Sequence, residues 1–97
     1  MNVHWTETAE AHLDSIYTYI GQNSESYALR TIDLITKRSQ QIGSFPFSGR
    51  RVPEFDADEV REVFEGAYRI IYYIKADQVD VIAVIHGAVN ILQNEKL

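Results

Sequence analysis

At 97 residues the chain is long enough for one hydrophobic core but not for two, so we expect a single domain spanning residues 1–97. The lack of cysteine excludes disulfides and thiol chemistry, and the net charge of −5 argues against broad electrostatic capture of nucleic acid. The first residues lack the basic start of a signal peptide, and no apolar run approaches the ~20 residues that span a bilayer. We therefore expect a cytoplasmic protein without a membrane partner.

The N-terminal residues predict a short strand that leads into a helix. Asn2–Trp5 is the candidate strand, and Thr6 stands where a helix N-cap would lie. Apolar residues at helical spacing then predict an amphipathic helix over Glu7–Ile20, and Gly21 is placed to end it.

A second helix follows after only a few polar residues, which predicts an antiparallel helical hairpin. Either Ser24 or Ser26 opens this helix, and Gly43 and Pro46 end it because neither propagates a helix. The loop Phe45–Phe55 then crosses to the last part of the chain.

The C-terminal half reads as three consecutive antiparallel strands. Tyr68–Lys75 alternates with the two-residue period of a strand, and Val79–His86 is apolar enough for a central strand. A strand over Glu59–Phe64 precedes them, joined through Gly66, which can take the positive φ of a short connection. The expected fold class is α+β: an N-terminal strand, a helical hairpin and a three-stranded antiparallel meander, all in one small sheet covered by the hairpin on one face. The pairing partner of the first strand stays open.

Metal and nucleophilic chemistry find little support in the residue spacing. His4, His12 and His86 lack an H-x-x-x-H or H-x-x-E-H pattern, so we expect no metal site and no cofactor. Ser44 and Ser48 lie in a loop without the G-x-S-x-G turn of a nucleophile.

Charged residues of the C-terminal half are the remaining candidates. The acidic run between Glu54 and Glu65 could supply a carboxylate pair, but a solvated surface is the favoured interpretation. Arg50 and Arg51 either neutralise that acidic run or bind a partner.

Arg69 and His86 each have two interpretations. Arg69 lies in the middle of a strand, where a cation is costly unless it is paired, for example with Glu62, or faces an anionic ligand or partner. His86 could carry a proton near neutral pH, although a hydrogen-bonded histidine at the strand end is favoured.

Five short motifs in a fixed order carry a resemblance that covers nearly the whole chain. They are Val3-His4-Trp5-Thr6, Phe45-Pro46-Phe47-Ser48-Gly49-Arg50, Arg61-Glu62, Tyr68-Arg69-Ile70-Ile71-Tyr72 and Val84-Ile85-His86-Gly87. With them the chain resembles the ParE branch of the RelE/ParE toxin superfamily. The resemblance implies a toxin of a bacterial type II toxin–antitoxin pair and the same order of strand, hairpin and three strands.

The superfamily divides by mechanism, and this chain departs from its ribosome-dependent nucleases. Arg69 matches the arginine of their Y-R-x-x-Y motif, but Val60 and Glu62 stand where those nucleases place lysines. After the last strand, Ala88, Val89 and Asn90 replace their basic ending. A nuclease needs cations for the RNA backbone and the scissile phosphate. The resemblance to the ParE branch instead implies a poison of DNA gyrase. That branch has no known set of catalytic residues to match with positions of this chain.

Three functions follow from the resemblance. The leading one is a non-enzymatic gyrase inhibitor neutralised by a cognate antitoxin, a DNA-binding protein whose C-terminal segment wraps the helical hairpin and a sheet edge. DNA would then be reached only through the antitoxin. The alternatives are a messenger endoribonuclease that uses Arg69, His86 and Glu62, and a degenerate toxin that only binds its antitoxin and represses the operon. The candidate residues for partner or target binding are Arg50, Arg51, Arg61, Arg69 and His86.

Overall fold

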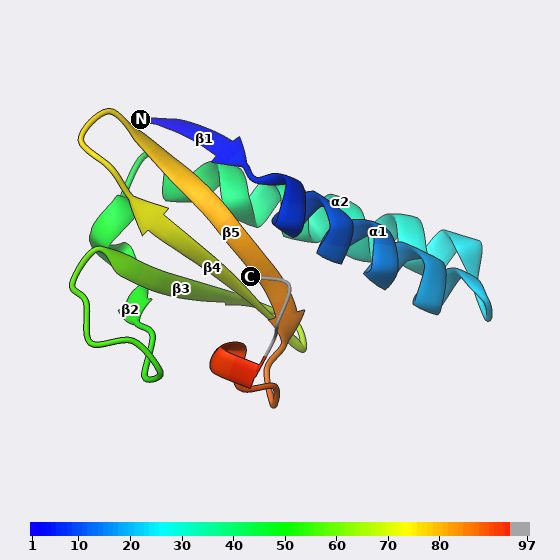
Figure 1. Cartoon of the computed structure of the whole chain (residues 1–97). Helices are drawn as coiled ribbons and strands as arrows, with labels where there is room; N and C mark the ends of the chain where they lie inside the picture. The colour runs from blue at the N-terminus through cyan, green and yellow to red at the C-terminus, as the bar shows by residue number, and fades with distance from the viewer. Residues whose placement is uncertain (94–97) are drawn as a thin grey trace.

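The computed structural model describes residues 1–93, which form a helical hairpin on one face of a five-stranded sheet (Figure 1). The elements are β1 (Asn2–Trp5), α1 (Glu7–Gly21), α2 (Glu25–Ile42), η1 (Pro46–Ser48), β2 (Arg50–Arg51), β3 (Val60–Glu65), β4 (Tyr68–Ile74), β5 (Gln78–His86) and η2 (Ile91–Gln93). The strand order is β1-β5-β4-β3-β2, with β1 parallel to β5 and every other pair antiparallel. The predicted α+β class is confirmed.

Polar caps start both helices of the hairpin. The Thr6 hydroxyl accepts a hydrogen bond from the Ala9 N–H, and the Ser24 hydroxyl accepts one from the Tyr27 N–H. Each cap satisfies a backbone donor that the first helical turn leaves free. Ser24 therefore opens α2. The hairpin projects past the sheet at the end where α1 meets α2 (Figure 1).

The sheet has one more strand than the sequence pattern predicts. Arg50 and Arg51 form β2, which pairs with Glu62 and Arg61 of β3 at the sheet edge. Two residues are too few to show a strand period, so this part of the predicted crossing loop gave no signal. The open question about the first strand is also settled, because β1 pairs with β5 over Gln78–Val81.

A bulge in β5 lets one strand serve two cores. Ile71 pairs with Ala83 and Tyr72 pairs with Val81, so Ile82 has no partner in β4. The extra residue shifts the alternation of side chains along β5. Val79, Val81 and Val84 consequently face the hairpin, whereas Ala83 and Ile85 face the opposite side of the sheet.

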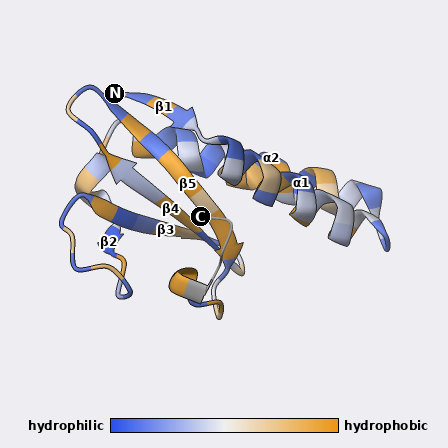
Figure 2. Ribbon diagram, viewed as in Figure 1, coloured by the Kyte–Doolittle hydropathy of each residue, from blue (hydrophilic) through white to orange (hydrophobic). Residues whose placement is uncertain are grey.

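Both faces of the sheet are therefore covered. The hairpin face packs under α1 and α2 around Ile16, Ile35, Ile42, Ile70 and Tyr72. We call the opposite side the second face; its core contains Val52, Val60, Ile71, Ala83, Ile85 and Ile91. Hydrophobic residues run along β5 and recur in η2 (Figure 2). Neither helix within residues 1–93 combines the length and apolarity that a bilayer crossing requires.

Candidate functional site

Arg69 sits on the second face at the centre of a network of buried ion pairs. Its side chain is 5% exposed. Nε donates to Glu62 Oε1 at 2.6 Å, while the two terminal nitrogens donate to the two Glu54 carboxylate oxygens at 2.8 Å each. The second oxygen of Glu62 accepts from Arg50 Nε. The fork of the guanidinium is thus filled by protein carboxylates.

The same network fixes the chain after β5 to the second face. Arg69 Nη1 also donates to the Val89 carbonyl at 2.8 Å, and the Ile91 N–H donates to Glu54 Oε2 at 3.1 Å. Ile91 itself is fully buried. The hydrogen bond from Arg69 is the largest influence on Glu54 and holds the pKa of that carboxyl at about 2, while Glu54 and Glu62 raise the pKa of Arg69.

The interpretation of the acidic run as a solvated surface is wrong for two of its members. The Glu62 side chain is fully buried, and the Glu54 side chain is 12% exposed. Asp56 and Asp58 are exposed, as that interpretation expects, and pair with Arg51 and Arg61. Glu54 and Glu62 differ from the other acidic residues because they are enclosed and pair with Arg69. The spacing of acidic residues in the sequence does not reveal which of them are enclosed.

The three residues of the ribonuclease hypothesis lie on two sides of the sheet. In the register of β4 and β5, Arg69 lies opposite Ile85 and Tyr68 lies opposite His86. Since successive strand residues point to opposite faces, Arg69 points to the second face and His86 to the hairpin face. There His86 contacts Tyr68 edge-on, with ring centroids 6.2 Å apart. His86 accordingly does not converge with the Arg69–Glu62 pair.

The other candidate arginines lie at the β2 edge. Arg50 and Arg51 have side chains 58% and 51% exposed, while the Arg61 side chain is largely covered and donates to the Gly49 carbonyl. Arg50 lies over the ring of Phe64 at 5.1 Å. The two exposed guanidinium groups are the ones that a partner can reach.

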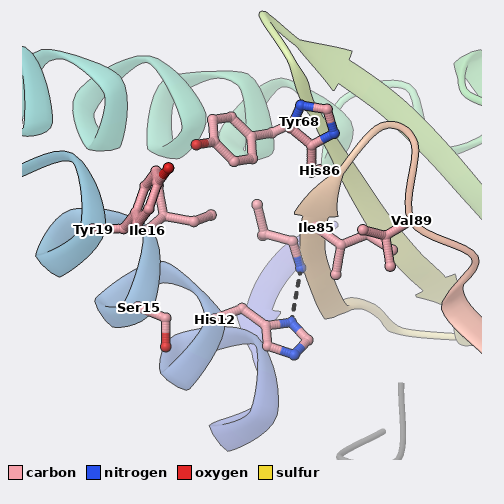
Figure 3. A pocket seen from close by; sticks show the side chains of 9 residues that line it. His12, Ser15, Ile16, Tyr19, Tyr68, Ile85, His86 and Val89 are labelled. Atoms are coloured by element: carbon pink, nitrogen blue, oxygen red, sulfur yellow. Dashed lines mark hydrogen bonds between the residues drawn. The ribbon is translucent and has the colours of Figure 1, made fainter. Parts of the chain in front are cut away.

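A groove of about 470 Å³ opens between α1 and the end of β5 (Figure 3). Its apolar walls come from Ile16 and Tyr19 on α1, Tyr68 on β4, Val84 on β5, and Val89. Its polar lining includes His12, Ser15 and His86, and we call it the hairpin groove.

Exposed aromatic residues extend the hairpin groove onto α2. An adjoining hollow is lined by Tyr19, Tyr27, Leu34 and Tyr68, among other residues. Tyr19 is 72% exposed and Tyr27 is 61% exposed. Burial, and after it the neighbouring phenols of Tyr27 and Tyr19, raises the pKa of Tyr68. Aromatic rings of this kind are enriched in protein–protein interfaces.

Sequence reasoning missed the contribution of His12 to this site. Its Nδ1 accepts a hydrogen bond of 3.2 Å from the Val84 N–H (Figure 3). His12 and Val84 are far apart in the chain, and an isolated histidine on a helix carries no spacing signal that would join them. Among residues 1–93 no group of three acidic or histidine side chains is arranged to hold a metal ion.

Together, the fold and the groove define a small α+β domain that presents a helical hairpin and an aromatic groove beside an open sheet. The chain belongs to the ParE toxin family of type II toxin–antitoxin systems, whose family model, described as the ParE toxin of parDE, matches residues 3–91. A solved structure of the chromosomal ParDE system from P. aeruginosa is similar, with a TM-score of 0.74 and 20% identity over 89% of this chain and 95% of that chain. That likeness supports the fold. No curated protein sequence matches the chain.

Proposed function

We propose that this ParE-family toxin inhibits DNA gyrase in the cytoplasm without catalysing a reaction, and that a cognate antitoxin neutralises it. The main support for this proposal is that Arg69 is buried and paired with two carboxylates. A nuclease of the superfamily would need that arginine free to meet the scissile phosphate. Here Nε of Arg69 donates to Glu62, both terminal nitrogens donate to Glu54, and the side chain is 5% exposed.

Within residues 1–93, the two carboxylates beside Arg69 are both held in ion pairs with arginine. Glu62 is held by two arginines, and His86 points to the other face of the sheet. Cleavage of RNA without a metal needs a base and an acid near one phosphate, each contributing about 10²–10⁴-fold. The arrangement favours an inhibitor that acts by binding.

Expression of the chain without an antitoxin tests the mode of action. We expect filamentous cells with DNA damage, while translated messages stay intact. Arg51→Ala should weaken growth arrest while lowering the stability by no more than about 1 kcal/mol, because this exposed guanidinium is available to a target. Lys37→Ala, which removes an exposed cation from α2, is the matched control and should leave growth arrest unchanged. Rapid cleavage of translated messages would contradict the proposal.

The antitoxin should occupy the hairpin groove and its extension along α2. The groove combines exposed rings with an open sheet edge, which are features that segments folding upon binding commonly use. DNA contact would come from the antitoxin, in keeping with the net charge of −5.

Co-purification with the product of the neighbouring reading frame tests this pairing. Tyr19→Asp should abolish the complex by placing a charge in the groove, whereas Leu29→Asp should keep it. Leu29 is also an exposed apolar residue of the hairpin, 54% exposed, but lies outside the groove lining. Separate elution of the two wild-type proteins at micromolar concentration would show that the neighbour is not the antitoxin.

A further inference from the structure

Two phenylalanine rings stand in solvent on the turn that precedes β2. Phe45 is 72% exposed and Phe47 is 57% exposed, and both belong to the short segment around η1. Single exposed apolar residues are ordinary on protein surfaces, but two rings on one turn put more apolar area in one place. η1, the green coil before β2, lies at the end of the sheet away from the projecting tip of the hairpin (Figure 1).

Hydrogen bonds hold this turn in place. The buried Tyr72 hydroxyl donates to the Pro46 carbonyl at 2.6 Å and accepts from the Gly49 N–H at 3.1 Å. The Ser48 hydroxyl and N–H both donate to the Phe45 carbonyl, at 2.7 and 3.0 Å. The backbone that carries the two rings is therefore fixed in advance, so a partner that covers them has little further backbone to order.

Two arginines of like charge lie beside the turn. Arg51 of β2 is directly opposite Arg61 of β3, and opposite residues of an antiparallel pair share one face of the sheet. The Arg61 guanidinium lies over the Phe47 ring, 5.1 Å from its centroid. Like charges directly opposite each other destabilise a sheet. The arginine pair therefore works against folding, which points to a role outside the fold.

The charges beside the rings favour an acidic protein surface over nucleic acid. Residues 38–53 contain three arginines and no aspartate or glutamate, in a chain with a net charge of −5. Arg51 pairs with Asp56, whose side chain is exposed, and such surface pairs are weak. A partner's carboxylate can therefore take the place of this aspartate. Interfaces with DNA are much more positively charged, whereas aromatic residues and arginine are enriched in interfaces between proteins.

We propose that Phe45, Phe47 and Arg51 form the surface that binds DNA gyrase, with both rings buried against an apolar part of gyrase and the Arg51 guanidinium paired with a gyrase carboxylate. This inference rests on the proposed function, because it takes gyrase as the target. A few aromatic and arginine residues commonly dominate the affinity of a protein interface. Neither ring belongs to the lining of the hairpin groove or of its extension, so antitoxin binding is a separate readout.

Inhibition of purified gyrase by full-length variants tests this surface. Phe45→Ala should raise the concentration of the chain needed for half-inhibition of supercoiling by about tenfold or more. Because its ring is exposed outside the groove, the variant should melt within about 4 °C of the wild type and keep its complex with the neighbouring gene product. Leu29→Ala, which removes a 54% exposed apolar side chain from α2, is the matched control and should leave inhibition unchanged.

Reversal of one charge gives a second readout. Arg51→Glu should weaken inhibition more than Arg51→Ala, because like charges across an interface repel each other. Equal inhibition by these two variants would show that no gyrase carboxylate meets Arg51 and would overturn that contact. Retention of plasmid DNA by the chain without gyrase, lost in Phe45→Ala, would show a nucleic-acid surface and overturn the inference.

The outcomes separate this inference from the proposed function. A wild-type chain that inhibits gyrase, together with a Phe45→Ala variant that inhibits it equally, would overturn the surface and leave the mode of action standing. Loss of the complex with the neighbouring gene product in Phe45→Ala would assign the ring to the antitoxin and also overturn the surface. A wild-type chain without effect on gyrase would overturn both.

Discussion

Replacing Arg69 by alanine should strongly destabilise the domain, because it removes the cation between two enclosed carboxylates. The Glu62 side chain is fully buried and that of Glu54 is 12% exposed, so neither can regain full hydration. Breaking one partner out of a buried ion pair costs about 3–5 kcal/mol. Arg50 still pairs with Glu62 in the variant, so we expect a loss near the lower limit, about 3 kcal/mol. For a domain of this size, that corresponds to a fall of roughly 12–24 °C in melting temperature.

Urea unfolding at pH 7, followed by circular dichroism, measures this loss. Arg51→Ala is the matched control: it breaks an exposed ion pair with Asp56 and should cost no more than about 1 kcal/mol. Adding Glu54→Gln and Glu62→Gln to Arg69→Met should recover much of the stability, since no buried charge is left alone among these three positions. An Arg69→Ala protein that melts within about 3 °C of the wild type would refute the structural role of Arg69.

Two further predictions concern pH and backbone contacts. The pKa of Glu54 is about 2 in the folded protein, against an ordinary value of 4.5, so its stabilising effect is full above about pH 4.5 and is lost as the pH falls towards 2. Glu54→Gln should flatten the pH dependence of the urea midpoint in that window, and equal slopes for both proteins would contradict the assignment. Gly49→Ala should cost more than about 2 kcal/mol, because its Cβ would meet the Tyr72 hydroxyl and lie 2.6 Å from the Glu62 carbonyl oxygen. Gly66→Ala has free space at a φ of 56° and should cost about 1 kcal/mol, so the reverse order in thermal melts would be contrary evidence.

Much of the fold could be predicted because local patterns determine it. Thr6 and Ser24 cap the helices, Gly66 takes its positive φ, and the two-residue alternation of Tyr68–Ile74 marks a strand. The bulge at Ile82 was not predicted, since a run of β-branched residues looks alike with and without an extra residue. It nevertheless decides which side chains of β5 reach each core.

The candidate site was less predictable because its contacts join distant parts of the chain. The pairing of Arg69 with Glu62 follows from the adjacent strands, and it was one of the two interpretations of that arginine. Glu54 reaches Arg69 from an irregular loop, and His12 reaches Val84 from a helix, so neither contact has a periodic pattern. Three-dimensional packing alone brings these residues together.

Inhibition of purified DNA gyrase is the most direct test of the proposed function. The purified chain is added to gyrase and relaxed plasmid, and supercoiling and DNA breaks are measured with and without the neighbouring gene product. We predict that the chain blocks supercoiling and causes broken DNA to accumulate, and that the neighbouring product restores supercoiling. Unaffected supercoiling, together with cleavage of messages on translating ribosomes by the same preparation, would contradict the proposal.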